Sequence, residues 1–284
     1  MASDELIKSS AEHAALARTP PQKRTKRRTD QDRAGLEVLA FGTHPDDLEI
    51  ACGGTLIHLA RQGYRVGAAD LTRGELGTRG TAEIRARETE AASRILGLAF
   101  RVNLGLPDGN LEPSQENLLA VMRLVREHRP RLVLAPYWEE RHCDHVHASR
   151  LVSEAAFYSG LAKIETGQPS FRPFRVLYYV SRIEFTPSFV MDISATFAAK
   201  MQALRCYRSQ FHHGKSEWGG EAETMISTPL ALEVLETLSR YYGAMIGARH
   251  GEPFLMRESL EITDPVAYFR AFPDDRQAQL FSRR

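Results

Sequence analysis

Short apolar runs alternate along the chain with segments whose apolar residues recur at helical spacing. The runs end at glycine, proline or a polar residue, as buried strands of a parallel sheet do. They predict strands at residues 36–42, 64–72, 100–104 and 131–135. Helical spacing predicts helices at residues 48–60, 81–96 (ending at Gly97) and about 118–128. Farther along, the pattern predicts strands at 176–180 and 189–193, and helices at 195–209 and 230–246.

This alternation of strands and helices is typical of an α/β fold. Right-handed crossovers between parallel strands place helices on both faces of the sheet. We therefore expect one Rossmann-like domain with a mostly parallel sheet over residues 35–284, including a C-terminal elaboration. Ligands bind such sheets beyond the carboxyl ends of the strands. Four polar loops follow predicted strands and place the active site at that edge: residues 44–47, 73–80, 106–109 and 139–147.

Composition excludes several classes of protein. The chain has 37 Lys and Arg against 36 Asp and Glu and is 43% hydrophobic, which excludes wholesale disorder and a strongly charged surface. No apolar run reaches the roughly 20 residues of a membrane helix, and no secretory signal is evident, so we expect no membrane partner. The cysteines are Cys52, Cys143 and Cys206. An odd number without CxxC spacing disfavours a disulfide scaffold and favours a cytoplasmic location.

Basic residues are concentrated in a leader, residues 1–34. Within it, the run KRTKRR at 23–28 has no apolar periodicity, which is typical of a disordered, solvated segment. The alternative is a nucleic-acid-binding arm on a non-enzymatic protein. Because no stripe of basic and aromatic residues follows it, we favour the disordered leader and expect no nucleic-acid partner.

Histidine and aspartate gather in two of the polar loops. One loop contains His44, Asp46 and Asp47, and the other contains His142, Asp144, His145 and His147. Imidazole and carboxylate groups are common zinc ligands, and a catalytic zinc typically has three protein ligands and a water whose pKa it lowers to about 7. A neighbouring carboxylate that is not a ligand can accept the proton of that water. Two alternatives are helix capping by the aspartates and phosphoryl transfer to one of them, but neither explains the histidines.

Three motifs carry a resemblance to a known family. AFGTHPDDLEI at 40–50, GGT at 53–55 and RHCDH at 141–145 resemble the LmbE/PIG-L family of zinc-dependent N-acetylglucosamine deacetylases. The similarity extends from about Leu36 to Phe254 and is greatest to the deacetylases of bacillithiol biosynthesis. It implies a hydrolase that removes acetyl from N-acetylglucosaminyl-malate. Other N-acetylglucosaminyl conjugates and chitooligosaccharides are the alternative substrates.

The resemblance also implies roles for individual residues. One zinc ion per chain, or Fe²⁺ in cells, would be bound by His44, Asp47 and His145. Asp46 would be the general base, His142 would stabilise the tetrahedral intermediate, and Asp144 would orient the ring of His142. Family members are often trimeric or hexameric, so the resemblance implies a homo-oligomer.

Some positions leave alternatives open. Arg85 matches a family arginine that reaches the sugar hydroxyls, or it is a surface residue of its helix. His250 is the nearest match to a family tyrosine that polarises the acetyl carbonyl. Cys143 replaces the usual proline and is a rival metal ligand to His145.

Arginines near the predicted pocket suggest the charge of the substrate. They are Arg73, Arg79, Arg85 and Arg141, of which Arg85 and Arg141 are our candidates for substrate binding. Since guanidinium groups bind carboxylates with two parallel hydrogen bonds, we expect a carboxylate on the aglycone, as in malate.

Overall fold

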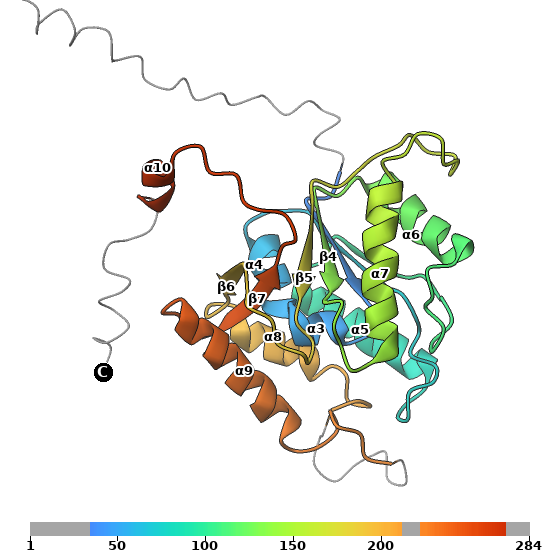
Figure 1. Cartoon of the computed structure of the whole chain (residues 1–284). Coiled ribbons are helices and arrows are strands. Elements are labelled where there is room, and N and C mark those ends of the chain that lie inside the picture. Colours follow the sequence, from blue (N-terminus) through green and yellow to red (C-terminus); the bar gives the residue numbers. More distant parts are fainter. Residues whose placement is uncertain (1–34, 212–221, 271–284) are drawn as a thin grey trace, which may run out of the picture. The chain divides into compact units, whose positions relative to one another are not determined.

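One seven-stranded sheet organises the chain, in the order β3-β2-β1-β4-β5-β7-β6 (Figure 1). The computed structural model describes residues 35–211 and 222–270, so the predicted leader at 1–34, and the nucleic-acid alternative with it, lies outside the described residues. The strands are β1 (Val38–Gly42), β2 (Val66–Asp70), β3 (Phe100–Asn103), β4 (Leu132–Pro136), β5 (Arg175–Tyr179), β6 (Phe189–Asp192) and β7 (Gly251–Leu255). Strands β1 to β5 are parallel, and β7 runs antiparallel between β5 and β6. The predicted mostly parallel sheet is confirmed.

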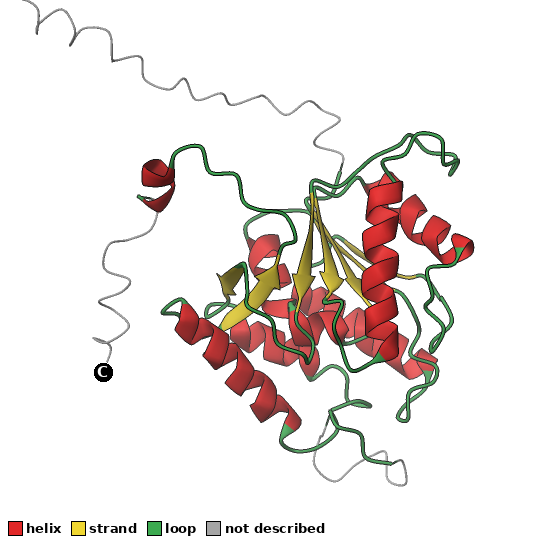
Figure 2. Cartoon of the chain, viewed as in Figure 1, coloured by secondary structure: helices red, strands yellow, loops and turns green. Residues whose placement is uncertain are grey.

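Helices cover both faces of this sheet, as predicted (Figure 2). They are α3 (Asp47–Ala51), α4 (Gly53–Arg61), α5 (Ala82–Leu96), α6 (Gln115–His128), α7 (Cys143–Tyr158), α8 (Phe197–Leu204), α9 (Ala231–Met245) and α10 (Pro265–Phe269). One apolar core lies under α3, α4, α5 and α8, and a second lies under α6 and α7. None of the described helices combines the length and the apolar character needed to span a bilayer.

The predicted helix at 48–60 is two helices, because the chain breaks at Cys52. The backbone of Cys52 has φ −139° and ψ 14°, which ends α3 and starts α4. Glu252, from β7, accepts the backbone N–H groups of Gly54 (3.0 Å) and Thr55 (2.7 Å) at the new helix start. The Lys200 ammonium lies 2.6 Å from the same carboxylate. A partner almost two hundred residues away therefore stabilises the break.

Three elements were not predicted from the sequence patterns: α7, β7 and the short α10. Helix α7 begins at Cys143, inside the segment expected to be a polar loop, and so contains Asp144 and His145. Strand β7 contains Gly251, Glu252 and Pro253, residue types that strands disfavour. Helix α8 also ends earlier than expected, at Leu204.

A buried ion pair lies beneath the carboxyl ends of β1 and β2. Arg101 of β3 donates two hydrogen bonds of 2.8 Å to Asp70 of β2, and two more, of 2.5 and 3.4 Å, to Glu49 of α3. The Tyr207 hydroxyl donates a further hydrogen bond of 3.1 Å to Glu49. These contacts fix α3, which starts at the first polar loop, against the two strands beside it.

The Glu252 contacts predict a large loss of stability on neutralisation. Glu252→Gln would leave Lys200 buried without a negatively charged partner, and breaking a buried ion pair typically costs about 3–5 kcal/mol. Urea denaturation should therefore show a clearly lower midpoint. Glu236→Gln, which removes the exposed pair with Arg240 on α9, is the matched control and should leave the midpoint almost unchanged. Equal midpoints for the two variants would contradict this role for Glu252.

Candidate active site

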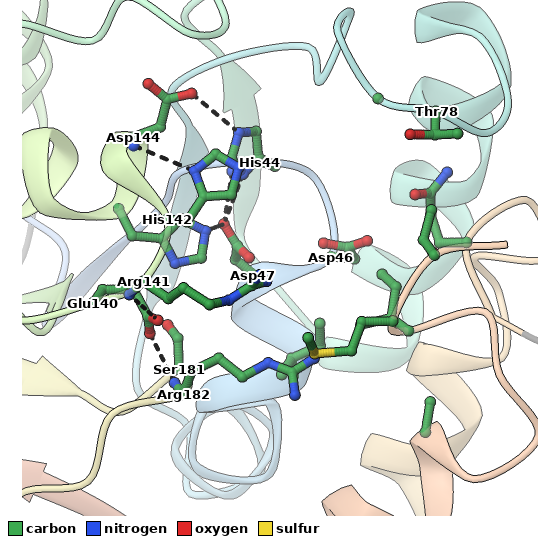
Figure 3. Close-up of a pocket in the computed structure, with 18 of the residues that line it drawn as sticks. His44, Asp46, Asp47, Thr78, Glu140, Arg141, His142, Asp144, Ser181 and Arg182 are labelled. Carbon is green, nitrogen blue, oxygen red and sulfur yellow. Dashed lines mark hydrogen bonds and ion pairs between the residues drawn. The ribbon is translucent and has the colours of Figure 1, made fainter. Parts of the chain in front are cut away.

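The sheet brings the two predicted loops together. Strands β2 and β3 continue the sheet on one side of β1, and β4 and β5 continue it on the other, so the strand order reverses between β1 and β4. Ligands bind such sheets at this point. The loop from β1 into α3 and the loop from β4 into α7 meet there and line a pocket of about 620 Å³. Figure 3 shows His44, Asp47, His142 and Asp144 converging in it.

His44, Asp47 and His145 form a group that can bind a metal ion. Their potential ligand atoms all lie within 4.8 Å of one another. Asp47 Oδ2 lies 3.3 Å from His145 Nε2 and 3.5 Å from His44 Nδ1. Ligands about 2.0–2.1 Å from a tetrahedral zinc are separated by roughly 3.3 Å, so the donor set and its spacing fit such an ion. The backbone N–H of His44 also donates to Asp47 Oδ2 (2.8 Å), which fixes the carboxylate.

Electrostatics within this group favour a negatively charged Asp47. Burial alone would raise its pKa, but His145 and His44 hold it well below the usual range. Burial would likewise lower the pKa of His44, yet hydrogen bonds to Asp108, Asp144 and Asp47 raise it well above the usual value. Several carboxylates thus contact the imidazole rings of this site. Such a negatively charged environment also suits a divalent cation.

Asp108 is a candidate site residue that the sequence analysis did not name. Its Oδ1 lies 3.0 Å from His44 Nε2, and its Oδ2 accepts the backbone N–H of Leu76 (2.9 Å). It orients the His44 ring from the side opposite Asp47. Its position in the polar loop after β3, at the same edge of the sheet as the other site residues, could have indicated this role.

Asp46 sits in a strained backbone conformation beside the ligand group. Its φ of 105° lies in a region that non-glycine residues rarely adopt. Its side chain does not cap α3, and it instead pairs with the Arg85 guanidinium (3.1 Å). Burial raises the pKa of Asp46 to about 7, although Arg85 opposes the shift. Helix capping, the alternative for this residue, is therefore wrong.

His142 is exposed at the start of α7 and has a defined hydrogen-bonding pattern. Its Nδ1 accepts the backbone N–H of Asp144 (3.2 Å). A neutral ring that accepts at Nδ1 carries its proton on Nε2, so His142 presents a donor. We predicted that Asp144 orients this ring, and it contacts the ring through its backbone. Its carboxylate instead accepts the N–H of Gly109 (2.8 Å) and lies 3.7 Å from His44 Nε2.

The candidate substrate residues separate into two groups. Arg85 and Arg141 line the pocket, and Arg85 is buried between Asp46 and the carbonyl oxygen of Pro45, so its interpretation as a surface residue is wrong. His250 does not line the pocket. Its ring is buried and stacks on Phe197 with the centroids 3.7 Å apart, so the fold does not bring it to the site.

The predicted cluster of arginines is also smaller than expected. Arg79 is buried and donates to the carbonyl oxygen of Ser209 (3.0 Å), and neither it nor Arg73 lines the pocket. Arg182, which follows β5 and was not predicted, lines it beside Arg141 (Figure 3). Glu140 accepts the backbone N–H groups of Arg141 (2.6 Å) and Arg182 (2.7 Å). These contacts use the backbone and not the guanidinium groups, which are therefore available to bind a ligand.

Cys143 and His147 do not join the ligand group. The metal-binding groups found among the described residues are His44–Asp47–His145 and His44–His142–Asp144, and neither includes Cys143 or His147. In the second group, His142 Nδ1 already accepts a backbone hydrogen bond. The first group is therefore the better metal site.

Comparison with known proteins shows the family of this chain. Residues 39–156, which include both loops, match the family described as "PIG-L: GlcNAc-PI de-N-acetylase". The diacetylchitobiose deacetylase of Thermococcus kodakarensis is 30% identical over 232 residues, which cover 76% of this chain and 81% of that protein. The chain belongs to the LmbE/PIG-L family of deacetylases. The resemblance found in the three motifs is thus confirmed at the level of the family.

Two further similar proteins show how far the similarity extends. The probable N-acetyl-alpha-D-glucosaminyl L-malate deacetylase 2 of Bacillus cereus is 30% identical over 61% of this chain and 83% of its own length. The crystal structure of the conserved protein TT1542 from Thermus thermophilus has a TM-score of 0.72 and 39% identity, covering 80% of this chain and 98% of that one. The similarity therefore extends beyond residues 39–156.

The ligand geometry predicts which residues retain the metal. His145→Ala removes one of three donors and should abolish stoichiometric binding of a divalent metal, measured by elemental analysis of the purified protein. Cys143→Ala changes a neighbouring residue outside the ligand group and should retain the metal. Full occupancy in His145→Ala, with loss in Cys143→Ala, would move the ligand role to the thiolate.

Proposed function

We propose that the protein is a metal-dependent hydrolase that removes the acetyl group from an N-acetylglucosamine-type sugar, releasing acetate and a free amine. The observation that carries this proposal is the group His44, Asp47 and His145 with the buried Asp46 beside it in one pocket. Family membership supports the reaction type. Zinc is the proposed metal, with Fe²⁺ as the alternative in cells.

A bound divalent metal supplies an acidified water and a Lewis acid that polarises the acetyl carbonyl. Asp46 is the proposed general base, because its raised pKa of about 7 suits accepting a proton at neutral pH and returning it to the departing amine. Arg85 is the proposed positioning residue, since its guanidinium contacts both the Asp46 carboxylate and the carbonyl oxygen of Pro45.

His142 is the proposed stabiliser of the negative charge that develops on the acetyl oxygen. Its Nε2–H is left free because Nδ1 accepts the N–H of Asp144. A donor oriented in advance lowers the barrier, since it needs no rearrangement when the charge appears. The proposed role of Asp144 is thus to fix the tautomer and orientation of His142 through its backbone.

The different roles of the adjacent aspartates can be separated. Asp46→Asn should retain the metal but lower kcat by about 10²–10⁴-fold, the usual contribution of a general base. Asp47→Asn should instead lose metal affinity, because Asp47 is in the ligand group. Amine release from N-acetylglucosamine and metal content, measured on the same preparations, test both expectations. Wild-type turnover by Asp46→Asn would exclude it as the base.

We propose two candidates for the substrate. N-acetylglucosaminyl-malate is supported by Arg141 and Arg182, whose guanidinium groups are suited to a carboxylate at the pocket rim. A chitooligosaccharide is supported by the longer match to a diacetylchitobiose deacetylase. We further propose a cytoplasmic homo-oligomer, trimeric or hexameric; all three cysteines are free, which suits a reducing compartment.

The carboxylate proposal has its own test. Arg141→Gln combined with Arg182→Gln should lower kcat/KM for N-acetylglucosaminyl-malate about tenfold relative to N-acetylglucosamine, and this difference should shrink as salt is raised. Arg73→Gln, an exposed arginine outside the pocket, is the control. Equal efficiency of the wild-type protein on both sugars at low salt would remove the carboxylate argument and leave a general sugar deacetylase.

A further inference from the structure

One side of the active-site pocket is apolar and open to solvent. Its largest exposed apolar side chains are Leu76 (71% exposed), Leu230 (62%), Met225 (51%) and Val234 (45%). Leu76 comes from the loop between β2 and α5, and the other three come from α9 and the segment before it. The same pocket contains His44, Asp46 and Asp47, so these side chains face the ligand that the catalytic groups would bind.

Helix α9 turns one continuous apolar face to the pocket. The residues that line it are Leu230, Ala231, Val234, Leu235 and Leu238. Their spacing of three to four residues places them on one side of the helix. Charged residues lie elsewhere on α9, where Glu236 and Arg240 form an exposed ion pair. The apolar lining is therefore a feature of this face and not of the whole helix.

The position of Leu76 is linked to the ligand group. Its backbone N–H donates to Asp108 (2.9 Å), which in turn contacts His44 (3.0 Å). Leu76 also packs against the backbone of Gly109, where an added Cβ would lie 2.9 Å from its Cδ1. This edge of the apolar surface is thus held at a fixed place relative to the metal site.

The proposed reaction by itself leaves this surface unused. An amino sugar presents hydroxyl groups, and its acetyl group must lie beside His44 and Asp46. Exposed apolar side chains gathered in a concave site mark a surface that a ligand covers. We propose that the natural substrate carries an apolar alkyl or aryl aglycone on its amino sugar, and that Leu76, Met225, Leu230 and Val234 bind it.

This inference rests on the proposed deacetylase function and extends it to the substrate class. It keeps the reaction but replaces the two aglycones proposed above, since neither malate nor a second sugar is apolar. An apolar aglycone that carries a carboxylate would still reach Arg141 and Arg182, which line the same pocket. A second copy of the chain is the rival occupant of the apolar surface. We favour the aglycone because the apolar and catalytic residues line one and the same pocket.

The test compares kcat/KM for N-acetylglucosamine and for its phenyl and octyl glycosides, the last kept below its micelle concentration. The wild-type protein should prefer at least one glycoside by about tenfold or more, the scale on which apolar pockets discriminate. Leu230→Ser combined with Val234→Ser should reduce that preference about tenfold. Met245→Ser is the matched control, because Met245 lies on the same helix, is 47% exposed and does not line the pocket; it should keep the preference.

The outcomes separate this inference from the proposed function. If no N-acetylated sugar is cleaved by the metal-loaded wild-type protein, the proposed function fails and the inference fails with it. If N-acetylglucosamine is cleaved but neither glycoside is preferred, or the preference survives in the double variant, the inference alone fails. A lower oligomeric mass of the double variant in light scattering would assign the apolar surface to a subunit contact and would also overturn the inference.

Discussion

The Arg101 guanidinium joins two buried carboxylates beneath the turn that contains Asp46 and Asp47. Asp70 is 1% exposed and Glu49 is fully buried, so neither charge is stabilised by bulk water. Glu49 lies two residues after Asp47, and its contact with Arg101 therefore sets where α3 begins. Removing one member of such a buried group leaves the remaining charges without a partner of opposite sign. This lowers the stability of the fold far more than the loss of an exposed ion pair does. The ligand group above depends on this arrangement.

Local sequence signals predicted most of the parallel sheet. Helix α5 illustrates why: the Thr81 hydroxyl accepts the N–H of Ile84, and Gly97 ends the helix with φ 70°. Both ends are determined by residues within the element, so the pattern alone suffices. The meeting of the His44 and His145 loops was likewise predictable, because the carboxyl ends of parallel strands share one edge.

Long-range partners could not be predicted in the same way. The break at Cys52 depends on Glu252, and the burial of Arg85 depends on its contact with Asp46, 39 positions away. His250 looked suitable by alignment, yet stacking on Phe197 removes it from the pocket. In each case the side-chain chemistry was evident but its three-dimensional partner was not. Motif spacing identifies which groups are available, and tertiary contacts decide which of them meet.

The backbone of Asp46 has a consequence for engineering this protein. A non-glycine residue in such a conformation costs on the order of 1–3 kcal/mol, which the surrounding contacts must offset. Glycine adopts positive φ freely, so Asp46→Gly relieves that strain while deleting the carboxylate. The same substitution leaves the Arg85 guanidinium buried without its negatively charged partner, and breaking a buried ion pair typically costs about 3–5 kcal/mol, which is more than the strain. A screen that rewards thermal tolerance alone would therefore keep the aspartate, so directed evolution for heat resistance preserves the proposed general base at this turn.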